Sequence, residues 1–450
     1  MLNKLKSLKE KMGTGVQQVI SNLAWLFTDK IFQMGTGLII GAFLNRLLGP
    51  EDIGLFNYAI AFVTLFSPIA QMGLDSLVVR DIARDPLTTG ETLGTTFVIK
   101  ITGGIITFIL AILVIIGLKP DEVLTHNLVT IIAGSTIFLA FDTIDFWFQS
   151  KLLAKYTVIP RNIVYIIISL TRISLIIFKA PVIAFAWAKL LESGLGALAL
   201  IIAYRVKGES INTWKFNFQR AKELINNSWP LILTSITVII YSKIDQVMLG
   251  SLLPDPKPLG YYSVAVKISE IFDFIPWIIY TSLIAKLTEQ KAKSNESYLH
   301  KFQIYFDLMF ILWLAVAIPV SLLSPVAIAI YGGEKFTESA KILSIYVWAQ
   351  FGSNFGLARN AYLIIEGKMK MSFYLSIFGA ALNIVLNAFL IPMPGPLGGA
   401  IGATVATLIT YFAVTVLINF FIKDLNIIAS FIIRSVNIYK SIFRLRELIK

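Results

Sequence analysis

The stretch GGAIGATVATLITYFAVTVLINFFI, residues 398–422, decides the fold class of this chain of 450 residues. It carries no charged residue and, at about 1.5 Å per residue, is long enough to cross a hydrocarbon core of about 30 Å as a helix. Its apolar residues do not alternate with period two, which excludes a strand of a membrane barrel. We therefore predict a transmembrane helix here.

Eleven further apolar runs precede this one, and the overall composition agrees with them. Hydrophobic residues make up 56% and charged residues 15%, with a mean hydropathy of +0.75, against roughly 45–50% and about 25% in soluble domains. We predict an all-α polytopic membrane protein of about twelve helices. The other runs are 18–44, 54–79, 93–117, 128–148, 160–178, 182–204, 225–250, 260–285, 303–330, 342–365 and 371–391.

The positions of lysine and arginine predict the orientation. The segments that would face the cytoplasm hold 26 of these cations and the external loops hold 6, which fits the positive-inside rule with both termini cytoplasmic. The start of the chain shows no removable signal peptide, so we expect a multi-pass protein in the cytoplasmic membrane of a prokaryote. Because the basic excess is spread over seven short segments, a nucleic-acid partner is excluded. Those segments are 1–15, 80–92, 149–161, 205–222, 286–301, 366–370 and 423–450.

The longest central polar stretch, 205–227, divides the predicted spans six and six. We predict an N-lobe at 1–204, a cytoplasmic linker at 205–224, a C-lobe at 225–422 and a basic cytoplasmic tail at 423–450. An even number of spans in each half produces parallel repeats, related by a pseudo-two-fold axis along the membrane normal.

A repeated turn supports this symmetry. LLGPEDIGLFNYAIAF (47–62) resembles LLPDPKPLGYYSVAVK (252–267), because each has a proline-containing turn followed by glycine and aromatic residues that open the next helix.

Both chain ends carry apolar residues at helical spacing among cations. Helices of this kind lie on anionic inner leaflets, and a solvated basic tail is the alternative. The apolar residues are Leu2, Leu5, Leu8 and Met12 at the start, and Ile438, Ile442, Leu445 and Ile449 at the end.

Ionisable residues inside the spans are the most informative ones, since each costs roughly 2.5–3.5 kcal/mol on insertion scales. Placed inward from both halves, the cations would line a polar cavity suited to a phosphate or diphosphate, and acids beside them are candidates for ion coupling. Neutralised pins between helices and snorkelling residues are the alternative. The cations are Lys30, Lys243, Lys267 and Arg359, and the acids are Asp29, Asp145, Asp245 and Glu270.

Enzymatic chemistry finds no support in the sequence. The chain has no cysteine and only two histidines, and it contains no Walker A motif, metal-ligand cluster or nucleophile elbow. We predict neither a catalytic activity nor a cofactor.

Two stretches make the chain resemble a known family. The first is LNRLLGPEDIGLFNYAIAF (44–62), with Gly49, Pro50 and Gly54, followed by IAQMGLDSLVVRDIAR (69–84). The second, 364–407, is IIEGKMKMSFYLSIFGAALNIVLNAFLIPMPGPLGGAIGATVAT. It carries an N-x-x-x-N pair and a proline before its glycine-rich segment, at Asn383, Asn387 and Pro392. They resemble the polysaccharide repeat-unit flippases of the multidrug/oligosaccharidyl-lipid/polysaccharide exporter superfamily.

This resemblance implies two six-helix lobes and alternating access. It implies translocation of polyprenyl-diphosphate-linked oligosaccharide units for surface polysaccharides such as O-antigen. Membrane lipids surround such a protein, and a glycan polymerase or glycosyltransferases are the partners that the resemblance suggests. Relatives that flip the peptidoglycan precursor use cations on the first and eighth helices, which Lys30 and Lys267 would match.

Two rival functions remain at this point. A cation-coupled drug or metabolite antiporter of the same superfamily would use an acidic N-lobe pocket, for which Asp29, Asp142 and Asp145 are available. A membrane-embedded glycosyltransferase or polymerase is disfavoured, because the chain has no large external loop with acidic or histidine residues.

Overall fold

The computed structural model describes residues 14–208, 210–395 and 398–446, and within these ranges the chain forms helices and turns without a strand. Ten helical segments in the described ranges are long and apolar enough to cross a membrane. The prediction of an all-α polytopic membrane protein is therefore confirmed. Of the predicted interfacial residues, Leu2, Leu5, Leu8, Met12 and Ile449 lie outside the described ranges.

The number of spans depends on two interrupted segments. The segment α2 (Thr14–Gln71) is broken at Gly49, whose φ of 79° lies in the region that favours glycine. The short helices α14 (Glu338–Tyr346) and α15 (Gln350–Ile365) follow each other across a 3₁₀ turn and are not among the ten. Twelve spans would require α2 to cross twice and α14 with α15 to cross once, so that count stays a prediction.

The chain divides into two compact units. Unit 1 takes the described residues up to Leu47 together with Ala59–Ile239, and unit 2 takes Leu48–Tyr58 with the described residues from Ile240 onward. This division differs from the predicted linker at 205–224. Trp214 and Leu224 pack in the hydrophobic core of unit 1, so apolar burial holds the linker and the start of the next helix to that unit.

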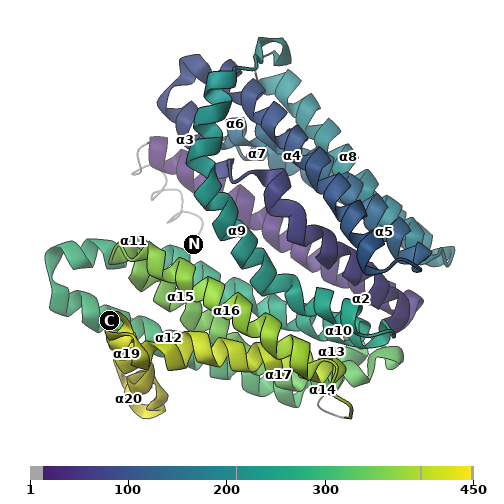
Figure 1. The fold of residues 1–450 in the computed structure, drawn as a ribbon. Coiled ribbons are helices and arrows are strands. Elements are labelled where there is room, and N and C mark those ends of the chain that lie inside the picture. Colours follow the sequence, from purple (N-terminus) through teal and green to yellow (C-terminus); the bar gives the residue numbers. More distant parts are fainter. Residues whose placement is uncertain (1–13, 209, 396–397, 447–450) are drawn as a thin grey trace, which may run out of the picture. The chain divides into compact units, whose positions relative to one another are not determined.

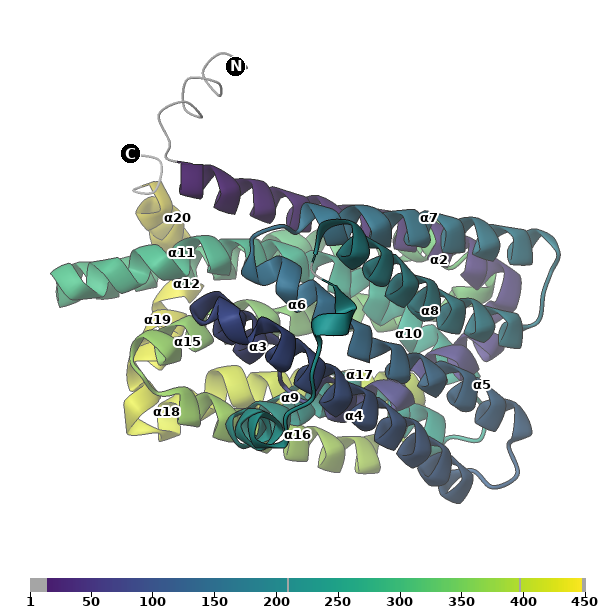
Figure 2. The ribbon, with the colours of Figure 1, turned by 90° about the horizontal axis from the view of Figure 1, so that it is seen from above.

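Unit 1 is a bundle of helices whose neighbours along the chain pack together. Figure 2 shows α3, α4 and α6 beside one another. The predicted spans 160–178 and 182–204 are confirmed as separate helices, since the chain turns at Lys179 with a φ of 52°. Besides its part of α2, the unit contains α3 (Asp75–Arg84), α4 (Thr89–Leu118), α5 (Val123–Gly134), α6 (Asp142–Ser150), α7 (Lys155–Ile177), α8 (Val182–Lys207) and the first part of α9 (Phe218–Leu252) (Figure 1).

Two glycines let α4 approach its neighbours closely. A Cβ atom on Gly103 would lie 2.5 Å from the Ile69 carbonyl oxygen, and one on Gly104 would lie 2.8 Å from the Thr136 carbonyl oxygen. Small residues at such contacts are the usual basis of helix packing in membranes, where lipid provides no hydrophobic force between helices.

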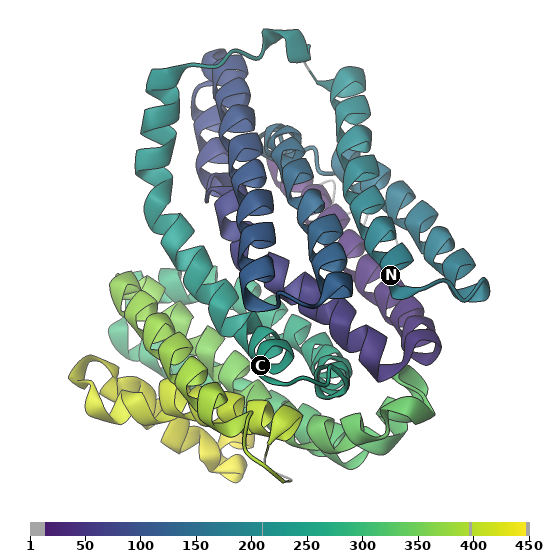
Figure 3. The ribbon, with the colours of Figure 1, turned by 45° about the vertical axis from the view of Figure 1, so that its right-hand side comes forward.

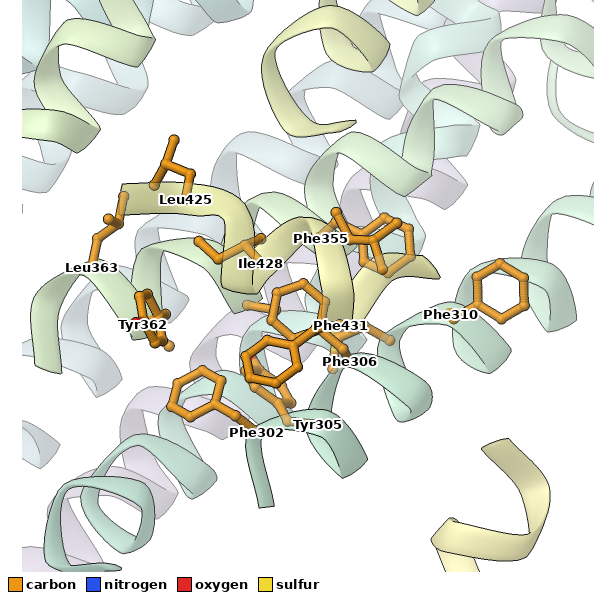
Figure 4. Close-up of a cluster of buried hydrophobic side chains, with 14 of the residues drawn as sticks. Phe302, Tyr305, Phe306, Phe310, Phe355, Tyr362, Leu363, Leu425, Ile428 and Phe431 are labelled. Carbon is orange, nitrogen blue, oxygen red and sulfur yellow. The ribbon is translucent and has the colours of Figure 1, made fainter. Parts of the chain in front are cut away.

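Unit 2 is built around a cluster of buried apolar side chains, many of them aromatic (Figure 4). Phe302 and Phe306 of α12 lie 5.6 Å and 5.4 Å, between ring centroids, from Tyr362 of α15 and Phe431 of α19. Its further helices are α10 (Lys257–Glu270), α11 (Phe274–Lys293), α12 (Asn295–Leu322), α13 (Ser324–Tyr331), α16 (Met369–Leu390), α17 (Gly399–Phe412), α18 (Ile418–Phe421), α19 (Asn426–Val436) and α20 (Ile438–Leu445).

The repeated turns predicted from the sequence contact each other inside unit 2. A Cβ atom on Gly54 would lie 2.2 Å from the Pro256 carbonyl oxygen, and one on Gly260 would lie 1.9 Å from the Pro50 carbonyl oxygen. Each turn therefore needs a glycine where the backbone of the other passes. The contact explains why glycine recurs in both turns, and the wider pseudo-symmetry stays a prediction.

Candidate functional site

Asp245 of α9 is a buried carboxylate in unit 2, with 7% of its surface exposed. It accepts hydrogen bonds from the Tyr262 hydroxyl of α10 at 2.8 Å, the Asn387 amide of α16 at 2.5 Å and the Thr407 hydroxyl of α17 at 2.6 Å. All three donors are neutral. In the described part of the chain, no ion pair joins Asp245 to a cation.

The two asparagines of the family-like stretch belong to this site. Asn383 and Asn387 share a face of α16, because residues four apart on a helix lie one above the other. The Asn387 amide also donates to Asn383 Oδ1 at 3.0 Å. The motif predicted as structural thus supplies the surroundings of a buried acid.

The turn between α16 and α17 brings Thr407 to the same place. Pro392 follows the last residues of α16, where its ring ends the helix. A Cβ atom on Gly398 would lie 1.7 Å from the Met393 carbonyl oxygen, so this tight turn requires glycine. The proline and the glycines of the motif therefore set the geometry that delivers a hydroxyl to Asp245.

The arrangement suits a group that changes its charge. A buried carboxylate with only neutral donors keeps an uncompensated negative charge, which is costly away from water. Among the described residues, none donates a hydrogen bond to Asn387 Oδ1 beside it. Binding of a proton or a small monovalent cation at Asp245 would remove the charge. No group of three or more His, Cys, Asp or Glu side chains that could hold a metal ion occurs among the described residues.

Lys243, Lys267 and Glu270 form a second cluster in unit 2. Glu270 lies 3.4 Å from the Lys243 ammonium and 4.0 Å from the Lys267 ammonium. The Lys267 side chain is 58% exposed and the other two are partly exposed. One carboxylate between two ammonium groups leaves a net positive charge that an anion could approach.

Arg359 differs from these lysines because its side chain is buried. It is 6% exposed, and its guanidinium donates a hydrogen bond to the Val414 carbonyl inside unit 2. Val414 lies in the π-helical turn Ala413–Leu417, where the regular helical pairing of carbonyls is interrupted. Arg359 thus contacts the interior of unit 2, and that the four predicted cations line one cavity stays a prediction.

Unit 1 holds an ionic cluster around Arg161 of α7. Its guanidinium lies 2.8 Å from Asp142 and 3.0 Å from Asp145 of α6. Asp145, one of the predicted coupling acids, also accepts a hydrogen bond from the Gln149 amide at 3.0 Å. These contacts make Asp145 an ion-paired acid, unlike Asp245.

Asp29 and Lys30 are adjacent on α2. Asp29 accepts a hydrogen bond from the Gln33 amide at 2.8 Å and interacts electrostatically with Arg161. Lys30 is exposed, and no ion pair involves it in the described ranges. Of the predicted cations, Lys30 is therefore the one most open to a ligand.

Lys100, Asp75 and Arg161 were not among the predicted site residues. Lys100 is 1% exposed on α4, lies 3.9 Å from Asp75, and places its ammonium 4.6 Å from the centre of the Phe146 ring. Its position inside an apolar run was a signal that could have identified it. Arg161 was assigned to a cytoplasmic segment, but α7 begins at Lys155 and carries it into the bundle.

Comparison with known proteins identifies the family. A family model described as "Polysaccharide biosynthesis protein" matches residues 19–284. The chain belongs to this family. A second model, MatE, matches residues 230–389, and the predicted resemblance to flippases of the exporter superfamily is confirmed.

Other members of the superfamily share this architecture at low identity. A probable low-salt glycan biosynthesis flippase, Agl15, of Haloferax volcanii is 22% identical over 87% of this chain and 81% of its own length. An inward-facing multidrug resistance MATE family transporter has a TM-score of 0.71 at 15% identity, covering 88% of this chain and 95% of that one. The lipid II flippase MurJ, in an inward closed conformation, also has a TM-score of 0.71, at 14% identity over 92% and 91%. These structures support the fold of this member of the polysaccharide biosynthesis protein family.

Proposed function

We propose that this chain is a flippase that moves polyprenyl-diphosphate-linked oligosaccharide units across the cytoplasmic membrane by alternating access, for surface polysaccharide biosynthesis. A charged, hydroxyl-rich head group cannot cross hydrocarbon unaided, whereas the prenyl chain can stay in lipid. The chain acts as a transporter and not as a catalyst. Both termini face the cytoplasm, and glycosyltransferases and a polymerase supply and consume the glycan.

The observation that carries the proposal is the family match over residues 19–284. This range includes three of the predicted cations, Lys30, Lys243 and Lys267, which are exposed or partly exposed. In this proposal Lys30, Lys243 and Lys267 contact the diphosphate during transport, because charge-assisted hydrogen bonds from ammonium groups stabilise phosphate oxygens. The relative named as a glycan flippase supports the substrate class.

Energy for the transport comes in this proposal from an ion gradient through Asp245. The sequence contains no nucleotide-binding motif, and Asp245 is the predicted coupling acid that is both buried and held by neutral donors. Uptake and release of one positive charge at Asp245 would alter the packing of α9, α10, α16 and α17, the helices that its hydrogen bonds join.

Replacement of the lysines tests the proposal. Lys30→Ala and Lys267→Ala should each lower glycan export several-fold while Lys→Arg at either position retains more export, because the diphosphate needs positive charge. Lys286→Ala, at an exposed lysine of α11, is the matched control. Surface glycan and accumulated lipid-linked precursor are measured at equal protein levels. Full export by both alanine variants would contradict the role of these cations.

A cation-coupled multidrug or metabolite antiporter is the second candidate, favoured by the MatE match over residues 230–389. It predicts a different ranking in the same membranes. Asp29→Asn or Asp145→Asn would abolish efflux of a cationic dye, and Lys30→Ala would have a mild effect. Dye efflux that depends on Asp29 or Asp145, together with unchanged glycan export in the same variants, would favour the antiporter.

A further inference from the structure

A groove runs along the outside of unit 1 between α7 and α8, which lie side by side (Figure 3). It encloses a cavity of about 410 Å³. Ala199 and Ala203 hollow its α8 side because their side chains are small, and Pro160 and Val164 of α7 form part of the opposite wall.

The rim of the groove is apolar and exposed. Ile163 of α7 is 53% exposed, and Ile202 and Val206 of α8 are 55% and 70% exposed. Exposed isoleucine and valine in such a contiguous strip are stable against hydrocarbon and unfavourable against water. The groove is therefore suited to contact with the lipid chains of a membrane.

Two lysines stand at one end of this apolar groove. Lys155 is the first residue of α7 and Lys207 the last residue of α8, and both line the cavity. No carboxylate pairs with either lysine within the described ranges. Their recorded partners are aromatic rings: Trp25 at 5.9 Å from Lys155, and Tyr156 at 5.5 Å from Lys207.

An apolar groove that ends in two cations, neither of them paired with a carboxylate of the described residues, matches a lipid with a doubly phosphorylated head. A phosphodiester lipid offers one phosphate charge, whereas a diphosphate offers a phosphate for each ammonium group. The two lysines belong to segments 149–161 and 205–222, which the cation distribution places at the cytoplasmic face.

We propose that the α7–α8 groove binds the prenyl chain of a polyprenyl diphosphate from the cytoplasmic leaflet, with the diphosphate against Lys155 and Lys207. This inference rests on the proposed function, since it names where the lipid part of the same substrate class docks. A docking site on the lipid-facing side of unit 1 keeps the prenyl chain in hydrocarbon. The head group then only has to pass from this pair of lysines to the transport pathway.

Two pairs of variants test the groove. Lys155→Gln with Lys207→Gln removes both charges. The control Lys151→Gln with Arg205→Gln removes two exposed cations close to these lysines in sequence that do not line the groove. Ala199→Phe fills the cavity, and the control Leu198→Phe enlarges an exposed neighbour on the same helix outside the lining.

Binding is measured by native mass spectrometry of the purified full-length chain with a sugar-free polyprenyl diphosphate. The double glutamine variant should lower the affinity about fivefold, the range expected for two exposed ion pairs. Ala199→Phe should lower it similarly, and both controls should bind as the wild type does. Phosphatidylglycerol should displace the polyprenyl diphosphate poorly.

Unchanged binding in both the double glutamine variant and Ala199→Phe would overturn the groove as a prenyl diphosphate site. Equal displacement by phosphatidylglycerol would also overturn it and would assign the groove to an ordinary anionic phospholipid. Translocation of the lipid-linked glycan in proteoliposomes is scored separately. If the wild type translocates the glycan but the groove variants bind the polyprenyl diphosphate unchanged, only this inference is contradicted. If binding depends on the two lysines but the wild type translocates no glycan, only the proposed function is contradicted.

Discussion

Unit 2 contains two buried carboxylates, Asp307 on α12 and Asp245 on α9, that are held in opposite ways. Asp307 is 0% exposed and pairs with Arg444 of α20, whose Nε lies 2.5 Å from Oδ2 and whose Nη2 lies 2.8 Å from Oδ1. The hydroxyls of Ser435 and Ser441 donate to it at 2.8 Å and 3.0 Å. The Gln303 amide also donates to Asp307, at 3.0 Å. Asp245 accepts three hydrogen bonds, and every donor is neutral.

The difference shows Asp307 as an ion-paired structural acid, and the coupling role of Asp245 stays a proposal. A buried acid beside a guanidinium is neutralised permanently, so Asp307 fixes α20 against α12. A buried acid among hydroxyls and amides is oriented by them, and its charge stays available for a proton or a cation. The charge of the neighbours distinguishes the two sites: a guanidinium lies beside Asp307, and the donors to Asp245 are neutral.

The largest expected effect comes from removing the arginine. Arg444→Gln leaves Asp307 buried without its cation and should lower the free energy of unfolding by about 3–5 kcal/mol. Thermal unfolding of the purified chain in detergent measures the change. Arg446→Gln, which neutralises an exposed arginine near the end of α20, is the control. The double variant Asp307→Asn/Arg444→Gln should recover much of the loss, and a stable Arg444→Gln protein would break the comparison.

The second effect concerns activity and not stability. Asp245→Asn keeps the size of the side chain and removes its charge, so the protein should fold normally, while gradient-driven transport should fall about tenfold or more. Transport in proteoliposomes with an imposed proton or sodium gradient measures it, with Asp121→Asn at an exposed acid as the control. Wild-type transport by Asp245→Asn would show that Asp245 is structural, as Asp307 is.

A smaller effect is expected at Glu270, a carboxylate that is 38% exposed and lies between Lys243 and Lys267. Glu270→Gln removes partly exposed ion pairs and should change the free energy of unfolding by less than about 1 kcal/mol. The released positive charge should raise the affinity for the diphosphate head two- to threefold. Binding of a polyprenyl diphosphate to the variant and to the wild type, at increasing salt, measures this affinity. Weaker binding by Glu270→Gln than by the wild type would indicate that Glu270, and not the lysines, contacts the substrate.

The smallest effect is expected at Glu122, in the turn before α5. Partial burial acts to raise the pKa of this carboxyl, but hydrogen bonds from Lys119 and Thr125 and the charge of Lys119 outweigh it and lower the pKa below its ordinary value. The stabilisation is present above the unfolded pKa and is lost as the pH falls through the folded pKa. Glu122→Gln should change the free energy of unfolding at neutral pH by about 0.5 kcal/mol or less, and should flatten its acid dependence.

Much of the fold could be predicted because lipid imposes a simple rule on sequence. Apolar runs such as 182–204 coincide with helices, and the turn around Lys179 separates two predicted spans as expected. The limits of the compact units could not be predicted. They depend on which side chains pack together, as Trp214 does in unit 1, and hydropathy carries no information on that.

The candidate site was predicted only in part. Asp245 was predicted as a coupling acid from its charge in an apolar run, and Asn387 was predicted as part of a structural motif. Their hydrogen bond joins residues on different helices, and nothing in either local stretch indicates it. Arg359 shows the converse, since its charge was visible in the sequence and its burial against Val414 was not.

The sequence by itself determined that this protein spans a membrane as helices, because backbone groups in lipid must be satisfied within each segment. It also determined that charges would be placed within those helices. Only the tertiary structure decided what surrounds each charged residue: Asp307 meets an arginine that fixes α20, and Asp245 meets neutral donors. The physical reason is that the energy of a buried charge depends on its neighbours in space, which come from distant parts of the chain.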